Sequence, residues 1–171
     1  ELANSSGLPA KPKGVSYSTD YVEGIVVPRV MGVGAVPLGR TRVVDGLFCG
    51  QERRVEWNPA FDKNVVIDQW EKDGKKFCLF HETLHGMVGG WVSPRDFVEV
   101  RVSWHDETGR SWVAFASVDD PRAPAAGSNS YVRGTNHGSG SMARSLAGED
   151  QEKSALVCSI VHVSPNGSIP N

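Results

Sequence analysis

The sequence of 171 residues lacks long apolar runs, and it lacks a surplus of basic side chains. A helix needs about 20 mainly apolar residues to cross a bilayer, and no stretch of that kind occurs, so nothing in the sequence predicts a membrane span. Lysine and arginine number 18 against 20 acidic residues. Such a chain has no excess charge with which to neutralise phosphates, which argues against nucleic acid as a main partner.

Cysteine is scarce as well. Only Cys49, Cys78 and Cys158 occur, far apart and without a C-x-x-C motif. An odd, scattered set predicts reduced thiols in an intracellular compartment rather than a disulfide framework. The N-terminal stretch has neither the charged start nor the apolar middle of a signal peptide. We therefore expect a cytoplasmic protein, and because the chain does not begin with Met we expect it to be a fragment.

Helical periodicity is weak, and strand patterns dominate. Residues 41–57 are the best helix candidate, because apolar side chains recur there at roughly helical spacing, although Gly46 and Gly50 weaken the prediction. Residues 1–14, rich in Pro, Gly and Ser, are expected to be a flexible lead-in. Segments that read as strands, by alternation or by β-branched content, are 15–21, 25–36, 64–70, 76–85, 97–104, 111–118 and 155–163. The sequence thus predicts one domain built on an antiparallel meander.

His81, Glu82 and His85 spell H-E-x-x-H, the signature of zinc metalloproteases. The motif binds zinc when a helix places residues i and i+4 on one face. On a strand the same residues lie about 13 Å apart, at roughly 3.3 Å per residue. The segment is rich in poor helix formers and follows a turn signal, so the strand interpretation is favoured. A zinc metallohydrolase, with Glu107 as a distant further ligand, remains an alternative.

Glu82 and Arg101 each interrupt an otherwise apolar strand. Glu99, Arg101 and Ser103 would share one face of their strand, and valines the other, which favours a solvent-facing pair. The alternative is a buried ion pair inside a cavity. Charges are costly there unless paired, but they can anchor one polar group of an otherwise apolar ligand.

Residues 92–101, VSPRDFVEVR, resemble the (G/S)-P-R-D-(F/Y)-V segment of START domains, the lipid-transfer modules related to steroidogenic acute regulatory protein. Glu82 stands nineteen residues before Arg101, the spacing of the charged pair in the sterol-binding branch of that family. Further similar segments, in the family's order, are Glu56-Trp57-Asn58-Pro59, Val132-Arg133, His137-Gly138, Met142 and residues 159–170. The resemblance covers roughly residues 15–171, the expected extent of the domain.

The resemblance implies an α+β helix-grip fold, in which a curved antiparallel sheet surrounds a lipid cavity and a C-terminal helix. In the family that helix follows the Ile-Pro turn, and this chain ends at Asn171, so we expect the helix to be missing. The resemblance also implies no catalysis, no cofactor and one lipid per domain. Cholesterol or a related sterol is the expected ligand, and a carotenoid or a phospholipid is the alternative. A third possibility is an interaction module whose cavity is closed.

Site residues follow from the same resemblance. The charged pair that would bind the sterol hydroxyl falls on Glu82 and Arg101, and a further cavity histidine falls on His137. Ala114, small and mid-strand, would leave room for the ligand. The loop 86–96 would act as a gate, and its Trp91 would touch the bilayer. We expect a monomer that makes transient contact with membranes, peripheral to them.

Overall fold

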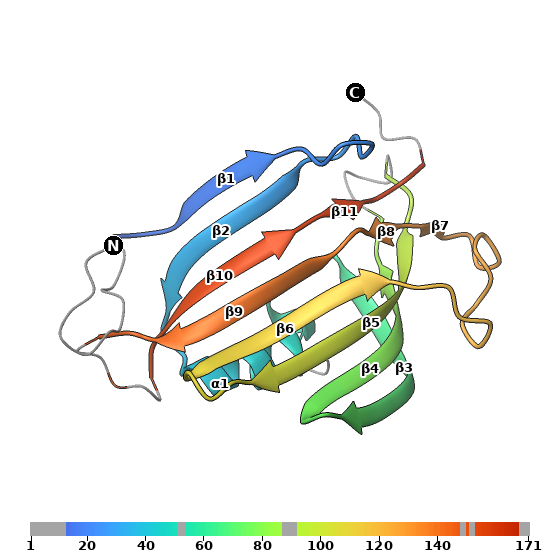
Figure 1. The fold of residues 1–171 in the computed structure, drawn as a ribbon. Helices are drawn as coiled ribbons and strands as arrows, with labels where there is room; N and C mark the ends of the chain where they lie inside the picture. The colour runs from blue at the N-terminus through green and yellow to red at the C-terminus, as the bar shows by residue number, and fades with distance from the viewer. Residues whose placement is uncertain (1–12, 51–53, 87–91, 148–149, 151–152, 168–171) are drawn as a thin grey trace.

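A single strongly curved antiparallel sheet dominates the computed structural model (Figure 1). The structure describes residues 13–50, 54–86, 92–147, 150 and 153–167. The strand order is β1-β2-β10-β9-β6-β5-β4-β3, and β7 pairs with β5. The strands are β1 (Ser16–Asp20), β2 (Arg29–Val36), β3 (Phe61–Lys72), β4 (Lys75–Leu84), β5 (Arg95–His105), β6 (Arg110–Ser117), β7 (Val132–Arg133), β9 (Ser139–Ser145) and β10 (Ala155–Val161). A small second sheet joins β8 (Thr135–Asn136) to β11 (Val163–Ser164).

The expected strands are confirmed, with ends that shift by a few residues, and two tight turns explain their pairing. Asp73 and Gly74 adopt φ values of 50° and 70° between β3 and β4. Positive φ at both central residues is what a two-residue hairpin turn needs. Between β5 and β6, Asp106 accepts hydrogen bonds from the hydroxyl and the backbone of Thr108, from the backbone of Arg110 and from the indole of Trp112. These bonds to the carboxylate, those of Thr108 and Trp112 foremost, hold the pKa of Asp106 well below its usual range.

The helix predicted over residues 41–57 is shorter than expected. It consists of α1 (Arg40–Arg42) and the π-helical η1 (Val43–Phe48), and a separate 3₁₀ turn, η2, covers Arg54–Glu56. Residues 51–53 lie outside the described chain. The helix ends where Gly50 packs onto Gly46, since a Cβ on Gly50 would lie 2.5 Å from the Gly46 carbonyl oxygen.

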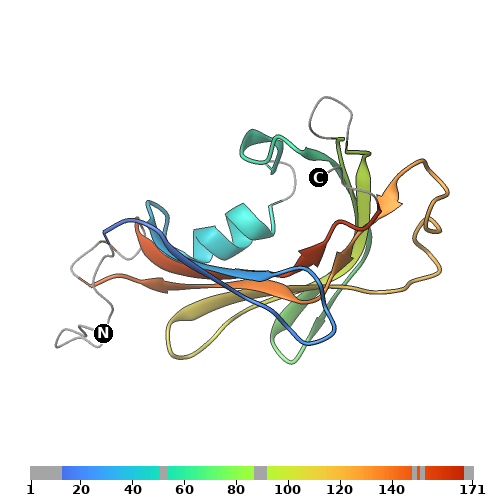
Figure 2. The same cartoon turned by 90° about the horizontal axis from the view of Figure 1, so that it is seen from above.

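The helix lies inside the curve of the sheet, on its concave face (Figure 2). Val43 and Val44 are fully buried against Val113, Ala143 and Ala155 of β6, β9 and β10. This contact forms the hydrophobic core. Within the described residues no helix follows β11.

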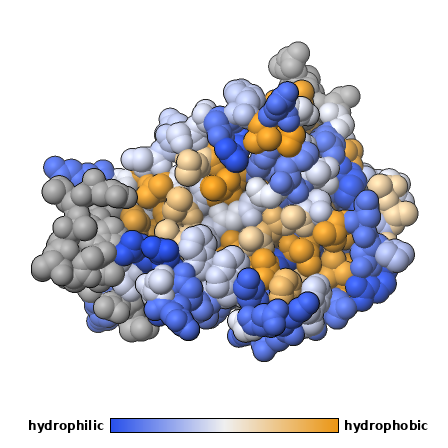
Figure 3. Space-filling view, in the orientation of Figure 1, coloured by the Kyte–Doolittle hydropathy of each residue, from blue (hydrophilic) through white to orange (hydrophobic). Residues whose placement is uncertain are grey.

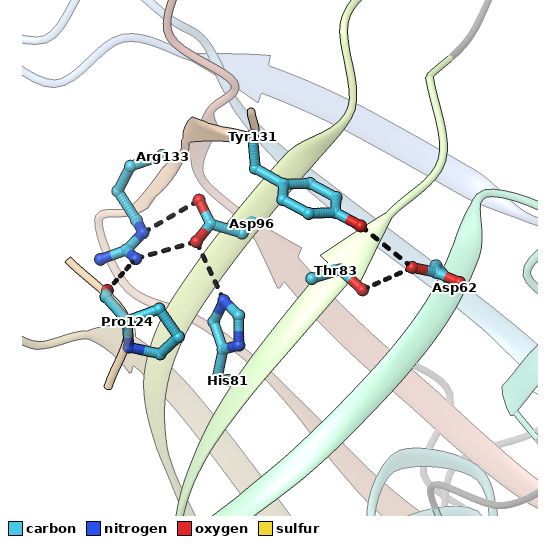
Figure 4. Close-up of polar contacts among 7 residues, drawn as sticks. All are labelled: Asp62, His81, Thr83, Asp96, Pro124, Tyr131 and Arg133. Atoms are coloured by element: carbon cyan, nitrogen blue, oxygen red, sulfur yellow. Dashed lines mark hydrogen bonds and ion pairs between the residues drawn. The ribbon is translucent and has the colours of Figure 1, made fainter. Parts of the chain in front are cut away.

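The convex face is covered at one end by the segment that follows β6. Asp96 of β5 accepts two hydrogen bonds from Arg133, at 3.0 and 2.8 Å, and is bound at 2.9 Å to the ring of His81 (Figure 4). Arg133 also donates to the carbonyl of Pro124, so the cluster fastens this segment to the sheet. Burial would raise the pKa of Asp96, but the bonds from Arg133 and His81 outweigh it and hold that pKa below its usual range.

Arg95, the neighbour of Asp96, performs the same task on the concave side. It is buried and donates to the carbonyls of Pro165 at 2.8 Å, Asn166 at 3.0 Å and Ser93. The Pro-Arg-Asp sequence therefore holds two distant segments, one on each face of the sheet, because successive side chains of a strand point to opposite faces.

Gly134 leaves no room for a side chain, and this gives a first prediction. A Cβ at this position would overlap Cε1 and Cζ of Phe97, a ring that lines the concave cavity described below. Gly134→Ala should therefore push the ring aside and lower the free energy of unfolding by about 1–3 kcal/mol in urea denaturation. Gly46→Ala is the control, because a Cβ there meets no atom within 4 Å. Equal stability of the two variants would contradict the packing described.

Apolar side chains also gather in places on the convex face (Figure 3). Trp104 and Trp112 stack there with their ring centroids 5.7 Å apart. No helix among the described residues has the length and apolar character needed to cross a membrane.

Candidate functional site

A cavity of about 220 Å³ lies on the concave face, between η1, η2 and the strands β4, β5 and β6. Its apolar lining includes Phe48, Trp57, Phe97, Phe115, Val161 and Val163. Its polar lining includes Arg54, Glu82, Glu99 and Asn136. An apolar cavity in which a few polar groups converge is the usual form of a small-molecule site.

Glu82 is the most perturbed acid in the cavity. It lies on β4, is 4% exposed and forms an ion pair with Arg54 of η2. The Arg54 guanidinium in turn lies 5.7 Å from the ring centre of Trp57 and 5.4 Å from that of Phe61. Burial raises the pKa of Glu82 to about 7, against the opposing charge of Arg54 and with a further contribution from Glu99. Near neutral pH this side chain is poised to accept or donate a hydrogen bond.

Glu99 is a second buried acid in the same cavity. It is 8% exposed, and its Oε1 accepts a hydrogen bond of 3.0 Å from the amide of Asn136. The Asn136 oxygen is held by the backbone N–H of Gly138 and the hydroxyl of Ser139, which fixes the orientation of the amide. Burial raises the pKa of Glu99 above its usual range, while Asn136 and the two nearby arginines, Arg54 and Arg101, act in the opposite direction.

The raised pKa of Glu82 predicts a pH dependence of stability. Between its ordinary value of 4.5 and about 7, the folded protein holds a proton that the unfolded chain releases. The contribution of Glu82 is therefore favourable at acid pH and is lost as the pH rises through this window. Urea denaturation should show the wild type losing stability relative to Glu82→Gln from pH 4.5 to about 7. A constant difference between the two proteins would refute the raised pKa.

Arg101 is buried, 6% exposed, so the solvent-facing interpretation of Glu99, Arg101 and Ser103 is wrong. Strand β5 is covered on both faces. The alternation of its side chains therefore cannot show which face is buried. The direct pair of Glu82 with Arg101 is not formed either. Arg101 lies opposite Cys78, four residues along β4 from Glu82, which is about 13 Å at roughly 3.3 Å per residue.

Arg101 instead contacts the last residue of η1. It donates to the carbonyl of Phe48 at 3.3 Å and lies 5.5 Å from the ring centre of Phe80. It lines a neighbouring polar hollow of about 480 Å³, together with Cys49 and Cys78. Among the residues that the structure describes, Arg54 is therefore the cation that lines the cavity, and Arg101 lines the neighbouring hollow.

Ala114 and His137 lie on the opposite face of the sheet from Glu82. Both line a convex hollow of about 640 Å³ with Trp104, Trp112 and Ile160. His137 is exposed and bonds to the hydroxyl of Ser164 at 2.7 Å. The structure thus separates both residues from the cavity that contains Glu82. Trp91 and residues 87–90 of the expected gate lie outside the described residues.

The H-E-x-x-H residues do not converge. His81 points to the convex face and binds Asp96, Glu82 points into the cavity, and His85 lies beyond the end of β4 with an exposed side chain. Strand geometry separates them, which contradicts the zinc site. Among the described residues no group of three or more potential ligands could hold a metal ion.

Sequence reasoning missed Arg54 and Asn136 and left Glu99 without a role. Glu99 could have been found, because it is two residues from Arg101 and must share its face. Nothing in the sequence around Arg54 predicts its role, because its partner Glu82 lies on β4 and the two meet only in the folded chain.

Comparison with known proteins agrees with the fold described above. A model of the START domain family matches residues 11–171. Human StAR-related lipid transfer protein 5 superposes with a TM-score of 0.75 at 23% identity, covering 96% of this chain and 74% of that protein. Human STARD10 gives 0.72 at 17% identity, covering 95% of this chain and 62% of that one.

A bacterial structure is similar too. The STAR-related lipid transfer protein fragment from Xanthomonas axonopodis superposes with a TM-score of 0.67 at 21% identity, covering 95% of this chain and 84% of the fragment. No curated protein sequence matches the chain. At these identities the superpositions establish a shared fold, and the family model spans nearly the whole sequence. The chain belongs to the START domain family.

Proposed function

We propose that this domain binds a single lipid, with a sterol as the favoured ligand, in the concave cavity and carries it between membranes. The observation that supports the proposal most is the pair of buried acids, Glu82 and Glu99, in a cavity otherwise lined mainly by aromatic and branched apolar side chains. Membership of a family that includes lipid transfer proteins points the same way.

In this proposal the affinity comes from burial of the apolar surface of the ligand. The orientation of the ligand is set by Glu82. Removing apolar ligand surface from water contributes roughly 25 cal/mol per Å². The Glu82–Arg54 pair binds the sterol hydroxyl, which orients the ligand and discriminates between head groups. The cavity of about 220 Å³ takes the polar end of the sterol. The rest of the molecule lies against its open rim, where Trp57 and Val161 are 45% and 50% exposed.

The domain performs no chemistry in this proposal, because its cavity acids act only as hydrogen-bonding groups. It works as a monomer in the cytoplasm and contacts membranes transiently when the lipid is loaded or released. Trp91 in the loop 86–96 remains our candidate for that contact. A carotenoid or a phospholipid in the same cavity is the second candidate ligand.

A transfer assay tests the proposal. Donor vesicles containing a fluorescent sterol are mixed with acceptor vesicles, with and without the protein. The proposal predicts a transfer rate that rises in proportion to protein concentration. A rate that stays at the protein-free level, together with transfer of a fluorescent phospholipid, would assign the domain to the second class of ligand.

A further inference from the structure

We propose that Glu99 and Asn136 form a second polar anchor in the cavity, and that the preferred ligand is a neutral sterol-like lipid with two hydroxyl groups on neighbouring rings. This inference rests on the proposed sterol-binding function and specifies its ligand. It follows from the register of β4 and β5, from the hydrogen bonds of Asn136 and from the charges around Glu99.

The register places the two acids at a defined spacing. Glu82 lies opposite Phe97, and Glu99 lies opposite Phe80, so the acids occupy diagonal positions on adjacent strands. Both line the same cavity and therefore project from the same face. Diagonal neighbours in an antiparallel pair have backbones about 7–8 Å apart. A ligand that meets both carboxyl groups needs two polar groups on that scale, at one end of the molecule.

Hydrogen-bond accounting leaves Glu99 with capacity for a ligand. Asn136 donates to one of its oxygens. The amide oxygen of Asn136 is itself engaged by Gly138 and Ser139, so this amide is fixed before a ligand arrives. Arg54 pairs with Glu82, and Arg101 donates to the carbonyl of Phe48. Within the described part of the chain, the second oxygen of Glu99 has no hydrogen-bond partner, so it is available to a donor on the ligand.

The surrounding charges favour a hydroxyl over an ammonium group. Arg54 and Arg101 both lie near enough to Glu99 to act on its carboxyl group. A cationic ligand group beside Glu99 would meet those two guanidinium groups, and like charges in a buried site repel strongly. A hydroxyl donates to the carboxyl group without that cost. The ligand class is therefore a neutral diol rather than an amino lipid.

The spacing discriminates between positions of the second hydroxyl. A hydroxyl on the ring adjacent to the first hydroxyl-bearing ring meets Glu99 while the first meets Glu82. A hydroxyl at the end of the sterol side chain lies far beyond the diagonal spacing of about 7–8 Å. It gains nothing from Glu99.

The test measures equilibrium binding of three probes: cholesterol, cholesterol hydroxylated on ring B, and cholesterol hydroxylated at the side-chain terminus. The wild type should bind the ring-B diol about tenfold or more tightly than cholesterol, the size expected for a hydrogen bond to a charged group. The side-chain diol should bind like cholesterol. Glu99→Leu should remove the preference for the ring-B diol over cholesterol, while Glu99→Gln should keep part of it.

Glu107→Gln, in the exposed turn between β5 and β6, is the matched control and should behave as the wild type. Circular dichroism establishes that each variant is folded. Should Glu99→Leu not fold, the wild-type comparison of the two diols and the Glu99→Gln variant still decide the matter. Equal wild-type affinity for all three sterols would overturn this inference and leave the proposed function intact. No binding of any sterol would overturn the proposed function, and this inference with it.

Discussion

Replacing Asp96 with alanine is expected to lower the free energy of unfolding by about 3–5 kcal/mol, the usual effect of removing one partner of a buried ion pair. Asp96 is the shared partner of Arg133 and His81, and its side chain is 4% exposed. Its loss leaves the Arg133 guanidinium without its anion and releases the segment that Arg133 holds through Pro124. Urea denaturation measures the stability, and hydrogen exchange should show faster exchange in residues 118–131.

A surface ion pair provides the matched control. Asp20 and Arg29 join β1 and β2 with side chains 53% and 41% exposed. Exposed pairs contribute about 1 kcal/mol or less, so Asp20→Ala should have a small effect. Similar losses of stability in Asp96→Ala and Asp20→Ala would show that the contacts of Asp96 do not hold the segment after β6 against the sheet.

Replacing Glu82 with leucine should weaken sterol binding about tenfold or more while the sheet remains folded. The variant loses the acid that would bind the ligand hydroxyl, and a hydrogen bond to a charged group contributes about 1.5–3 kcal/mol. It also leaves Arg54 without its partner inside the cavity. Titration with a fluorescent sterol measures the affinity, and circular dichroism checks the fold.

Arg101→Leu separates the two interpretations of the charged pair. Arg101 contacts the Phe48 carbonyl rather than Glu82, so its loss should weaken sterol binding by a smaller factor than Glu82→Leu. If Arg101→Leu weakened binding as much as Glu82→Leu, the two residues would act as one unit, as the family resemblance alone had implied.

The architecture was largely predictable from the sequence because its signals are local. Asp73-Gly74 specifies a hairpin turn, and the strands on either side are rich in apolar residues. The Ser-Pro-Arg-Asp-Phe segment could be identified by its resemblance to the family, but its structural role could not be predicted from the sequence. Only the structure shows that Arg95 holds the turn at Pro165 and that Asp96 holds Arg133.

The side of the sheet that each residue faces was harder to predict, because β5 is buried on both faces. Once Arg101 is known to face the helix, strand register determines the rest. Arg101 lies opposite Phe115, so Phe115 faces the cavity and Ala114 faces away. The same alternation places Asn136, rather than His137, on the cavity side. Knowing which face Arg101 occupies would therefore have placed Ala114 and His137 on the convex face.

The most direct test of a lipid-binding cavity is a native mass spectrum of the protein after incubation with a mixed lipid extract and zinc. The account predicts one adduct per chain at a sterol mass, without zinc, and a weaker adduct for Glu82→Leu. One zinc per chain and no lipid would contradict it and would indicate that His81, Glu82 and His85 bind the metal.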